Sequence, residues 1–227
     1  MLNFTFKLVS SRELQEEIYR LRFQIYVKEN DFISCEDCQD NKESDKFDDY
    51  SIHIAAIDKK GVLAGAVRLV LDSEYGFPME KYCHYPLFAK YKEANRENIA
   101  EISRLVIRKE YRIGQWNDPY HVIIGKTKGA IKESKCTISP ILFGLYGVAY
   151  QESKRRNITH WCAAMEDSLY NLVDTHGFVF NALGEPIEYY GRVVPYLSVL
   201  REIEKSLRGL KINSQNIFQK LLEPATA

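Results

Sequence analysis

The sequence predicts an α/β fold, of the α+β kind, in which a mixed central sheet is flanked by helices. Three observations favour this class: a helical repeat of apolar residues near the N-terminus, two strand-like runs joined by a short turn, and alternating strand and helix patterns from residue 101 onward. The 227 residues are enough to bury a substantial core. Because no internal repeat or clear boundary interrupts these patterns, we expect one domain.

The first expected helix spans residues 11–29. Ser10 and Glu13 have the spacing of a capping box, which marks the start of a helix. The apolar positions that follow recur at helical spacing: Leu14, Ile18, Leu21 and Ile25. Residues 30–50 are acidic and contain few apolar side chains, so we expect a long loop, and loops of this length are usually functional or disordered.

Two strand-like runs come next, at residues 52–57 and 62–71, and the four residues between them predict a hairpin turn. Alternation puts Ala64, Ala66 and Arg68 on one face of the second run. The later elements are expected as a strand at 101–107, a helix opened by Ser139 and Pro140, a strand at 158–164, a helix at 167–176, strands at 178–183 and 187–194, and a helix at about 197–208.

The bulk composition excludes several classes of function. The chain has 31 Lys and Arg against 31 Asp and Glu, so its net charge gives no global attraction to nucleic acid or to an anionic membrane. No apolar run is long enough to span a bilayer, and the N-terminus lacks the pattern of a signal peptide. We therefore expect a cytoplasmic protein whose five cysteines stay reduced.

The run at residues 101–107, Glu-Ile-Ser-Arg-Leu-Val-Ile, places two charged side chains on an apolar strand. Charged side chains are rarely buried unless they are paired, so this strand is either an ion-paired structural strand or the floor of an active site. Alternation places Glu101 and Ser103 on one face and Arg104 on the other. Only a β-bulge, which is common beside active sites, would bring Arg104 to the face of Glu101.

Several residues in order along the chain form a recognisable set: Arg22, Tyr26, Phe32, Asp45 and Asp48, Arg68, and Glu101-Ile102-Ser103-Arg104. This set resembles the signature of the acyl-homoserine-lactone (autoinducer) synthases and the related N-acyl amino acid synthases of the GNAT superfamily. The C-terminal Gly184-Glu185-Pro186, Tyr190-Gly191-Arg192 and Pro195-Tyr196 look more like the N-acyl amino acid synthases and the exosortase-associated acyltransferases. The resemblance implies a GNAT-like N-acyltransferase domain over residues 1–198, followed by a C-terminal helix and polar tail at 199–227.

Two departures from these families bear on the substrates. The lactone synthases usually carry Trp where Phe32 stands, and that position helps to hold S-adenosylmethionine, so Phe32 argues against a methionine-derived substrate. The signature of acyl-CoA binding is incomplete around Arg112 and Gly114, which favours an acyl donor on a carrier protein.

The resemblance therefore implies transfer of a fatty acyl group from acyl carrier protein to the amine of an amino acid. The carrier protein and the amino acid are the expected partners; the acyl thioester is a co-substrate, and no cofactor or metal is expected. The attacking amine must lose a proton, and Glu101 is the candidate base, directly or through one water. Backbone N–H groups near Val106 and Ile107, where the GNAT strand splays from its neighbour, would polarise the thioester carbonyl.

The other site residues are assigned as follows. Arg104 is expected to order the acidic loop through Asp45 or Asp48, while Arg22 and Arg68 contact those carboxylates or a substrate carboxylate. The predicted catalytic residues are Glu101, Arg68, Ser103 and Arg104. The predicted substrate-binding residues are Arg22, Tyr26, Phe32, Asp45, Asp48, Val106 and Ile107. Arg108, Lys109 and Arg112 are predicted to meet the phosphopantetheine phosphate and the acidic carrier protein.

Other interpretations stay open at this point. The chain could be an acyl-homoserine-lactone synthase that uses S-adenosylmethionine, or a non-catalytic module that binds acyl carrier protein. The Arg and Asp residues could form a purely architectural network. A zinc site built on Cys35 and Cys38 with Cys83 and His84 is weakly supported, because a single C-x-x-C lacks a second pair at proper spacing.

Overall fold

The computed structural model describes residues 4–83, 95–111 and 140–209. At its centre is an eight-stranded sheet in the order β1-β2-β3-β4-β5-β8-β6, and β7 also pairs with β8. The strands are β1 (Phe4–Leu8), β2 (Ser51–Asp58), β3 (Leu63–Leu71), β4 (Ile99–Ile107), β5 (His160–Met165), β6 (Asn181–Ala182), β7 (Ile187–Glu188) and β8 (Arg192–Val199). The β4–β5 pair is parallel and the other pairs are antiparallel, which confirms the predicted mixed sheet.

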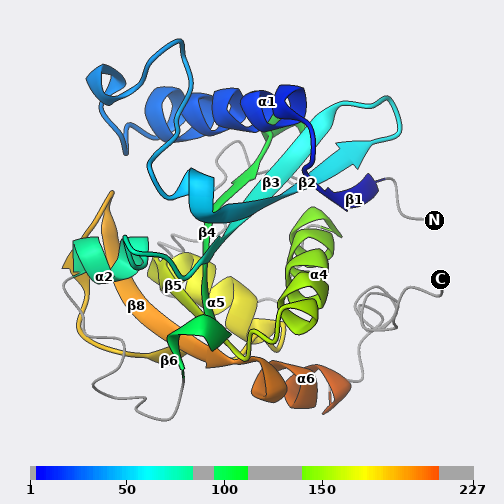
Figure 1. Cartoon of the computed structure of the whole chain (residues 1–227), viewed down its shortest axis with the longest axis vertical. Coiled ribbons are helices and arrows are strands. Elements are labelled where there is room, and N and C mark those ends of the chain that lie inside the picture. Colours follow the sequence, from blue (N-terminus) through cyan, green and yellow to red (C-terminus); the bar gives the residue numbers. More distant parts are fainter. Residues whose placement is uncertain (1–3, 84–94, 112–139, 210–227) are drawn as a thin grey trace, which may run out of the picture.

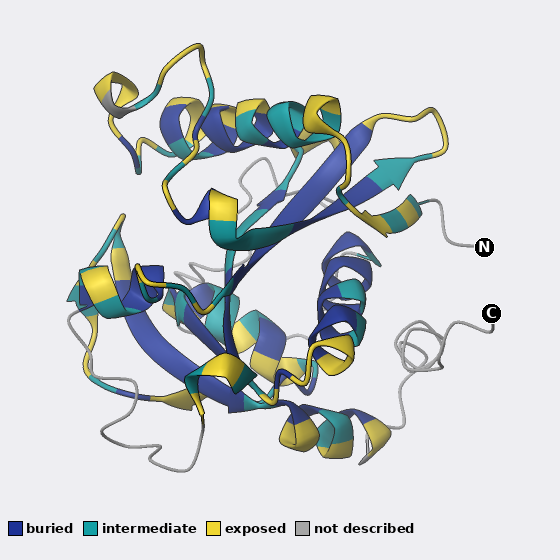
Figure 2. Ribbon diagram, in the orientation of Figure 1, coloured by how far each residue is buried: buried dark blue, intermediate teal, exposed yellow. Residues whose placement is uncertain are grey.

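Helices cover both faces of this sheet (Figure 1). They are α1 (Arg12–Phe23), α2 (Pro78–Cys83), α4 (Pro140–Arg155), α5 (Asp167–Thr175) and α6 (Leu200–Gly209). On one face, Ile18 and Leu21 of α1 pack against Ala66 and Val106 of the sheet. On the other, α4, α5 and α6 contribute to the largest core cluster, around Trp161. Figure 2 shows that the strands between these layers are mostly buried.

The strands β4 and β5 diverge after a short pairing. Their register runs only from Ile99 opposite His160 to Glu101 opposite Cys162, although β4 continues to Ile107. The splay that the family resemblance implied is therefore present. Glu101 stands at the point where the two strands part.

A β-bulge in β4 lies at Arg104, whose φ of 52° is in the left-handed region. The register between β3 and β4 shifts at this point, between Ala66 and Arg68. The extra residue brings the side chain of Arg104 to the face that carries Glu101 and Ser103, where it meets the acidic loop. Plain alternation would have sent Arg104 to the opposite face, so that simple expectation is wrong.

Several N-terminal details differ from the predictions. The N-cap of α1 is Ser11 rather than Ser10, because the Ser11 hydroxyl accepts the Leu14 N–H at 3.3 Å. The helix expected to continue to residue 29 changes after Phe23 into a π-helix (Gln24–Glu29). The strand β1 and the short helix α2 were not predicted.

One β3 prediction is also wrong. Ala64 does not share the face of Ala66, because a register shift between Ala56 and Ile57 turns Ala64 into the core cluster under α4. Short 3₁₀ turns, which the sequence did not predict, occur at Cys35–Asp37, Asp48–Tyr50, Arg96–Asn98 and Lys109–Tyr111.

The strand expected at residues 187–194 is in fact a hairpin. Tyr190 and Gly191 have φ values of 51° and 107°, and this turn separates β7 from β8. The strand expected at 178–183 is reduced to β6. Because β8 continues to Val199, the last helix begins at Leu200 rather than near 197, and it packs into the main core.

No helix within the three described ranges is long and apolar enough to cross a membrane. Four positions used in the sequence analysis lie outside the described residues: His84, Arg112, Gly114 and Ser139.

Candidate active site

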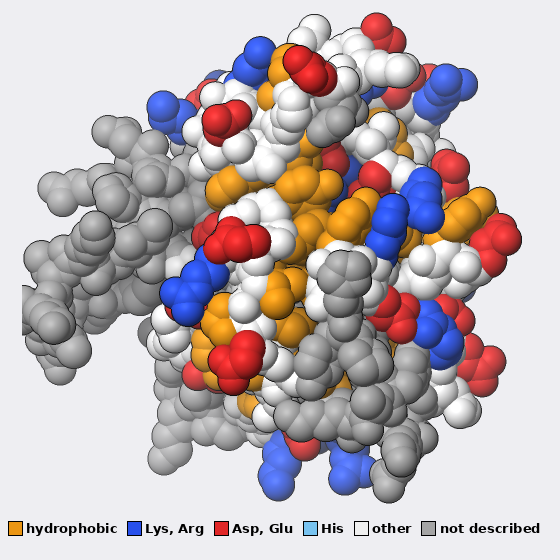
Figure 3. Space-filling model, turned by 90° about the vertical axis from the view of Figure 1, so that its left-hand side faces the viewer, with side chains coloured by type: hydrophobic (Ala, Val, Ile, Leu, Met, Phe, Trp, Pro, Cys, Tyr) orange, Lys and Arg blue, Asp and Glu red, His pale blue; other side chains and the backbone are white. Residues whose placement is uncertain are grey.

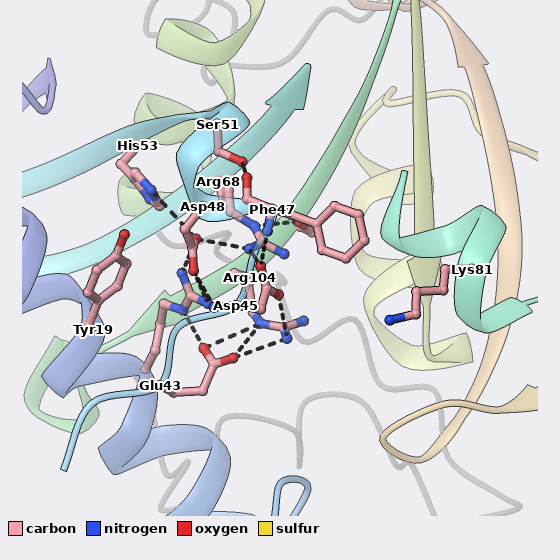
Figure 4. Close-up of polar contacts among 12 residues, drawn as sticks. Tyr19, Glu43, Asp45, Phe47, Asp48, Ser51, His53, Arg68, Lys81 and Arg104 are labelled. Carbon is pink, nitrogen blue, oxygen red and sulfur yellow. Dashed lines mark hydrogen bonds and ion pairs between the residues drawn. The ribbon is translucent and has the colours of Figure 1, made fainter. Parts of the chain in front are cut away.

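Charged side chains from four segments meet on the α1 face of the sheet (Figure 4). The arginines come from α1, β3 and the β4 bulge, and the carboxylates come from the loop between α1 and β2. We call these six side chains the arginine–carboxylate cluster: Arg22, Arg68, Arg104, Glu43, Asp45 and Asp48. Three guanidinium groups face three carboxylates, so the cluster carries no net charge.

Arg22 is enclosed by carboxylates. Its side chain is 1% exposed, its Nη1 and Nη2 donate to the two oxygens of Asp48 at 2.7 and 3.2 Å, and its Nε donates to Glu43. This bidentate geometry ties α1 to the acidic loop. The contacts favour a structural role for Arg22 over the predicted contact with a substrate.

Arg68 joins the acidic loop to β4. Its Nη1 donates to Asp45 at 2.7 Å and to Asp48 at 2.9 Å, and its Nε donates to the hydroxyl of Ser103 at 3.1 Å. Arg68 is 1% exposed. The structure thus brings together two of the predicted catalytic residues, Arg68 and Ser103.

Arg104 holds the loop from the other side. Its Nε donates to Glu43 at 3.2 Å and its Nη2 to Asp45 at 3.3 Å. Its guanidinium carbon also lies 5.6 Å from the ring centre of Tyr26 and 5.4 Å from that of Tyr190, within the range of cation–π contacts. Arg104 therefore orders the acidic loop as predicted, through Asp45.

Glu43 and Asp48 remain ionised at neutral pH. Burial alone would raise the pKa of Glu43, but Arg22 and Arg104 lower it to about 2. Burial likewise opposes ionisation of Asp48, yet Arg22 and Arg68 hold the pKa of this carboxyl well below its usual range. Each buried charge in the cluster is thus compensated by a neighbour of opposite sign.

Glu101 lies on the same face of β4 but outside this cluster. It is 2% exposed, and within the described part of the chain its one hydrogen bond comes from the backbone N–H of Met79, at 2.7 Å. Burial raises its pKa to about 7, an effect that the Met79 N–H, Arg68 and Arg104 only partly offset. A carboxyl group that titrates near neutrality can accept a proton at physiological pH.

Glu43 and His53 were not predicted as site residues. Glu43 lies between Arg22 and Arg104. His53 is 5% exposed and lies opposite Arg68 in the β2–β3 register, with its Nε2 3.6 Å from Asp48. Burial lowers the pKa of His53 to about 4, so this side chain is neutral at physiological pH.

Tyr26 and Phe32 lie together beside the bulge. The π-helix carries Tyr26, whose hydroxyl donates to the carbonyl of Leu105 at 3.1 Å. The Phe32 ring is 6.4 Å from that of Tyr26, and it also approaches Gly191 of the β7–β8 turn. π-helical turns are frequent at functional sites, and here the turn places Tyr26 beside the bulged part of β4, with Phe32 next to it.

The two predicted carbonyl-polarising groups differ in orientation. Arg108 donates its N–H to the carbonyl of Ala64 in β3, at 2.8 Å. Because backbone groups alternate along a strand, the N–H of Val106 also points toward β3, whereas that of Ile107 points away from β3. This orientation argues against a contact between the Val106 N–H and a substrate.

Two residues of the predicted basic patch, Arg108 and Lys109, lie within the described residues. The Arg108 side chain donates to the carbonyl of Leu63 at 2.8 Å and lies 3.8 Å from Glu17, so it is partly engaged within the protein. Lys109 is exposed, and Arg112 lies outside the described residues.

Candidate metal ligands were considered separately. Across the described ranges, no group of three or more His, Cys, Asp or Glu side chains is arranged to hold a metal ion. Cys35 and Cys83 are free thiols.

Comparisons with known proteins agree with this geometry. Residues 21–118 match the family model described as "Acetyltransferase (GNAT) domain". The fold is similar to that of BjaI, a CoA-dependent acyl-homoserine lactone synthase solved with SAM and isopentyl-CoA. That match has a TM-score of 0.64 and 17% identity, and covers 98% of this chain and 91% of BjaI.

Two further solved structures share the fold. The AHL synthase LasI aligns with a TM-score of 0.60 and 17% identity, over 87% of this chain and 90% of LasI. FeeM, an N-acyl amino acid synthase from uncultured soil microbes, aligns with a TM-score of 0.57 and 11% identity, over 89% of this chain and 94% of FeeM. At these identities the likeness shows the fold alone.

No curated protein sequence matches the chain significantly. The family match covers the α1 π-turn, the acidic loop, β3 and the bulged β4, which together build the candidate site. Residues 21–118 carry an acetyltransferase (GNAT) domain, and the chain is an acyltransferase.

Proposed function

We propose that this acyltransferase moves a fatty acyl group from acyl carrier protein to the amine of an amino acid, forming an N-acyl amino acid. The observation that carries the proposal is Glu101: a buried carboxyl group without an ion pair among the described residues, placed where β4 and β5 part. Its pKa of about 7, raised by burial, suits a general base at neutral pH.

The reaction needs three events at this site. Glu101 takes a proton from the ammonium group of the amino acid, and the freed amine attacks the thioester carbonyl. Backbone N–H groups of β4 beyond its short pairing with β5 would stabilise the oxyanion. The C–S bond then breaks, the nitrogen gives up its second excess proton to the departing carrier thiolate, which leaves as a thiol, and the amide remains on the amino acid.

The donor is proposed from the surface that follows β4. The exposed Lys109 and the partly exposed Arg108 come directly after this strand, where charges would meet a phosphopantetheine phosphate and an acidic carrier protein. BjaI is described as CoA-dependent, so coenzyme A is the alternative donor to test. Figure 3 shows hydrophobic side chains gathered across the middle of one face, the kind of surface that an acyl chain requires.

The acceptor is proposed from Phe32. This residue lies beside Tyr26 near the bulge, at the position where the lactone synthases usually carry Trp. We therefore favour an ordinary amino acid over S-adenosylmethionine.

Mass spectrometry of organic extracts tests the proposal. Cells that overproduce the chain should contain a new N-acyl amino acid, and this product should be absent from cells that overproduce Glu101→Gln. A new acyl-homoserine lactone would instead identify a lactone synthase. Absence of any new amide, with folded protein present, would contradict the proposed function.

A further inference from the structure

Two hydrogen-bond donors beside Glu101 lack an acceptor. The Nη2 atom of Arg68 is buried and, within the described part of the chain, has no hydrogen-bond partner. The neighbouring Ser103 hydroxyl accepts the Nε–H of Arg68, so its own proton remains to be donated, and no contact in the described ranges uses it. A buried donor without a partner costs free energy, and such groups in native proteins call for an explanation.

The two donors face the same way. In the planar guanidinium group, Nε and Nη2 form one edge, and the Nε–H of this edge points to Ser103. The opposite nitrogen, Nη1, is already used by Asp45 and Asp48, as Figure 4 shows. A carboxylate placed against the Nε–Nη2 edge would accept one hydrogen bond from Nη2 and a second from the Ser103 hydroxyl.

We propose that Arg68 Nη2 and the Ser103 hydroxyl bind the α-carboxylate of the amino acid acceptor, and so select acceptors that carry a free carboxylate. This inference rests on the proposed function and names its substrate class more closely. Arg68 and Ser103 are thereby specificity-determining residues, in addition to their contacts within the cluster.

The spacing along β4 fits an α-amino acid. Glu101 and Ser103 are two residues apart on one face, which corresponds to about 6–7 Å between their positions on the strand. An α-amino acid carries its amine and its carboxylate on one carbon, and a hydrogen bond of about 3 Å at each end lets it bridge this separation. With the carboxylate at Ser103, the amine lies next to Glu101.

Charge balance supports the same ligand. The arginine–carboxylate cluster is neutral by itself, because its three arginines are matched by three carboxylates. A zwitterionic amino acid adds no net charge to this site. Its ammonium group comes to lie next to Glu101, within reach of a direct proton transfer.

The first test compares matched acceptors on the wild-type enzyme. Each standard amino acid and its carboxamide are supplied with acyl carrier proteins that carry saturated chains of different lengths, and the amides are quantified by mass spectrometry. At low acceptor concentration we expect the free acid to react at least about tenfold faster than its carboxamide, because the charge-assisted hydrogen bonds are lost. Equal rates would overturn the inference and assign the two donors to the thioester carbonyl.

The second test uses two conservative variants, Ser103→Ala and Arg68→Lys, with Ser73→Ala and Arg155→Lys as matched surface controls. Both site variants should raise the KM for the amino acid more than they lower kcat, and should reduce the preference for the free acid. The controls should keep the wild-type preference. Unchanged preference in both site variants, with folded protein, would also overturn the inference.

The two proposals fail in different ways. If wild-type enzyme acylates neither the acids nor the carboxamides, the proposed function itself fails. If it acylates both equally, and Glu101→Gln abolishes both activities, the function stands and only the carboxylate site is wrong.

Discussion

Two charged side chains of β4, Arg104 and Glu101, have opposite electrostatic surroundings. Arg104, at the bulge, is paired with Glu43 and Asp45 and lies between two tyrosine rings. Glu101, three residues earlier, is more deeply buried but receives only the N–H of Met79 within the described residues. The pKa of Glu43 therefore falls to about 2, whereas burial raises that of Glu101 to about 7.

This difference distinguishes side chains that stabilise the fold from a side chain that can take part in catalysis. A buried charge with a matched partner is fixed in one state and serves to hold segments together. A buried carboxyl group without a matched cation can change its protonation state at neutral pH, which is the property that a general base requires. The cluster positions the acidic loop and the bulge, and Glu101 is left to react.

The largest expected effect is a loss of stability when one arginine is removed from the arginine–carboxylate cluster. Arg22→Met would leave Glu43 and Asp48 buried with one cation fewer, and we expect a loss of about 3–5 kcal/mol in the free energy of unfolding. Chemical denaturation measures it. The control Arg155→Met removes an exposed arginine that pairs with Glu152, and should change stability little. If the two variants were equally stable, the cluster would not be the structural anchor.

Substitution of Glu101 should lower the activity and leave the folding of the protein unchanged. Glu101→Gln keeps an acceptor for the Met79 N–H but removes the base, so amide formation should fall by about 10²–10⁴-fold while the protein stays folded. Initial rates with a saturating acyl donor, beside circular dichroism, check this expectation. Wild-type rates in the variant would mean that another group takes the proton.

The same substitution sharpens the comparison through pH. Because the folded pKa of Glu101 lies above its ordinary value of 4.5, the stability linked to this group is fully present below pH 4.5 and is lost as the pH rises through about 7. Glu101→Gln removes this loss. Its stability relative to wild type should rise by about 1–3 kcal/mol between pH 5 and pH 8, measured by denaturation at both values. If the stability difference between the variant and wild type were the same at pH 5 and pH 8, the pKa of Glu101 would not be raised by burial.

The smallest expected effect lies at the exposed basic rim. Lys109→Ala should lower kcat/KM for an acyl carrier protein donor by less than about tenfold, and most strongly at low salt, because rim charges act mainly on association. The rate with the matching acyl-CoA should fall less, because this donor presents the phosphopantetheine phosphate without the acidic surface of the carrier protein. An equal loss with both donors would argue against a carrier-protein contact at this residue.

Much of the fold was accessible from sequence because its periodic signals are local. The apolar repeat of α1, the hairpin of β2 and β3, and the Gly177 that ends α5 all depend on neighbouring residues. The exceptions depend on partners far along the chain. β1 exists because it pairs with β2, and the break between β7 and β8 requires left-handed backbone at Tyr190, a residue type that does not usually signal a turn.

The sequence predicted some residues of the candidate site and missed others. The family resemblance placed Arg68, Asp45, Asp48 and Arg104 in one network, and the structure brings them together. Glu43 was not singled out, because one more acidic residue in an acidic loop carries no signal until the loop folds back onto α1 and β4. The bulge could be named only as a condition, since register shifts arise from packing between strands rather than from composition.

The most direct test of this account is the pH dependence of the initial rate of amide formation, measured for wild type and Glu101→Gln with the same acyl donor and amino acid. The account predicts a rise with a midpoint near pH 7 in wild type that is missing from the residual activity of the variant, where only ionisation of the amine remains. A rise with the same midpoint in both proteins would contradict the claim that Glu101 is the base.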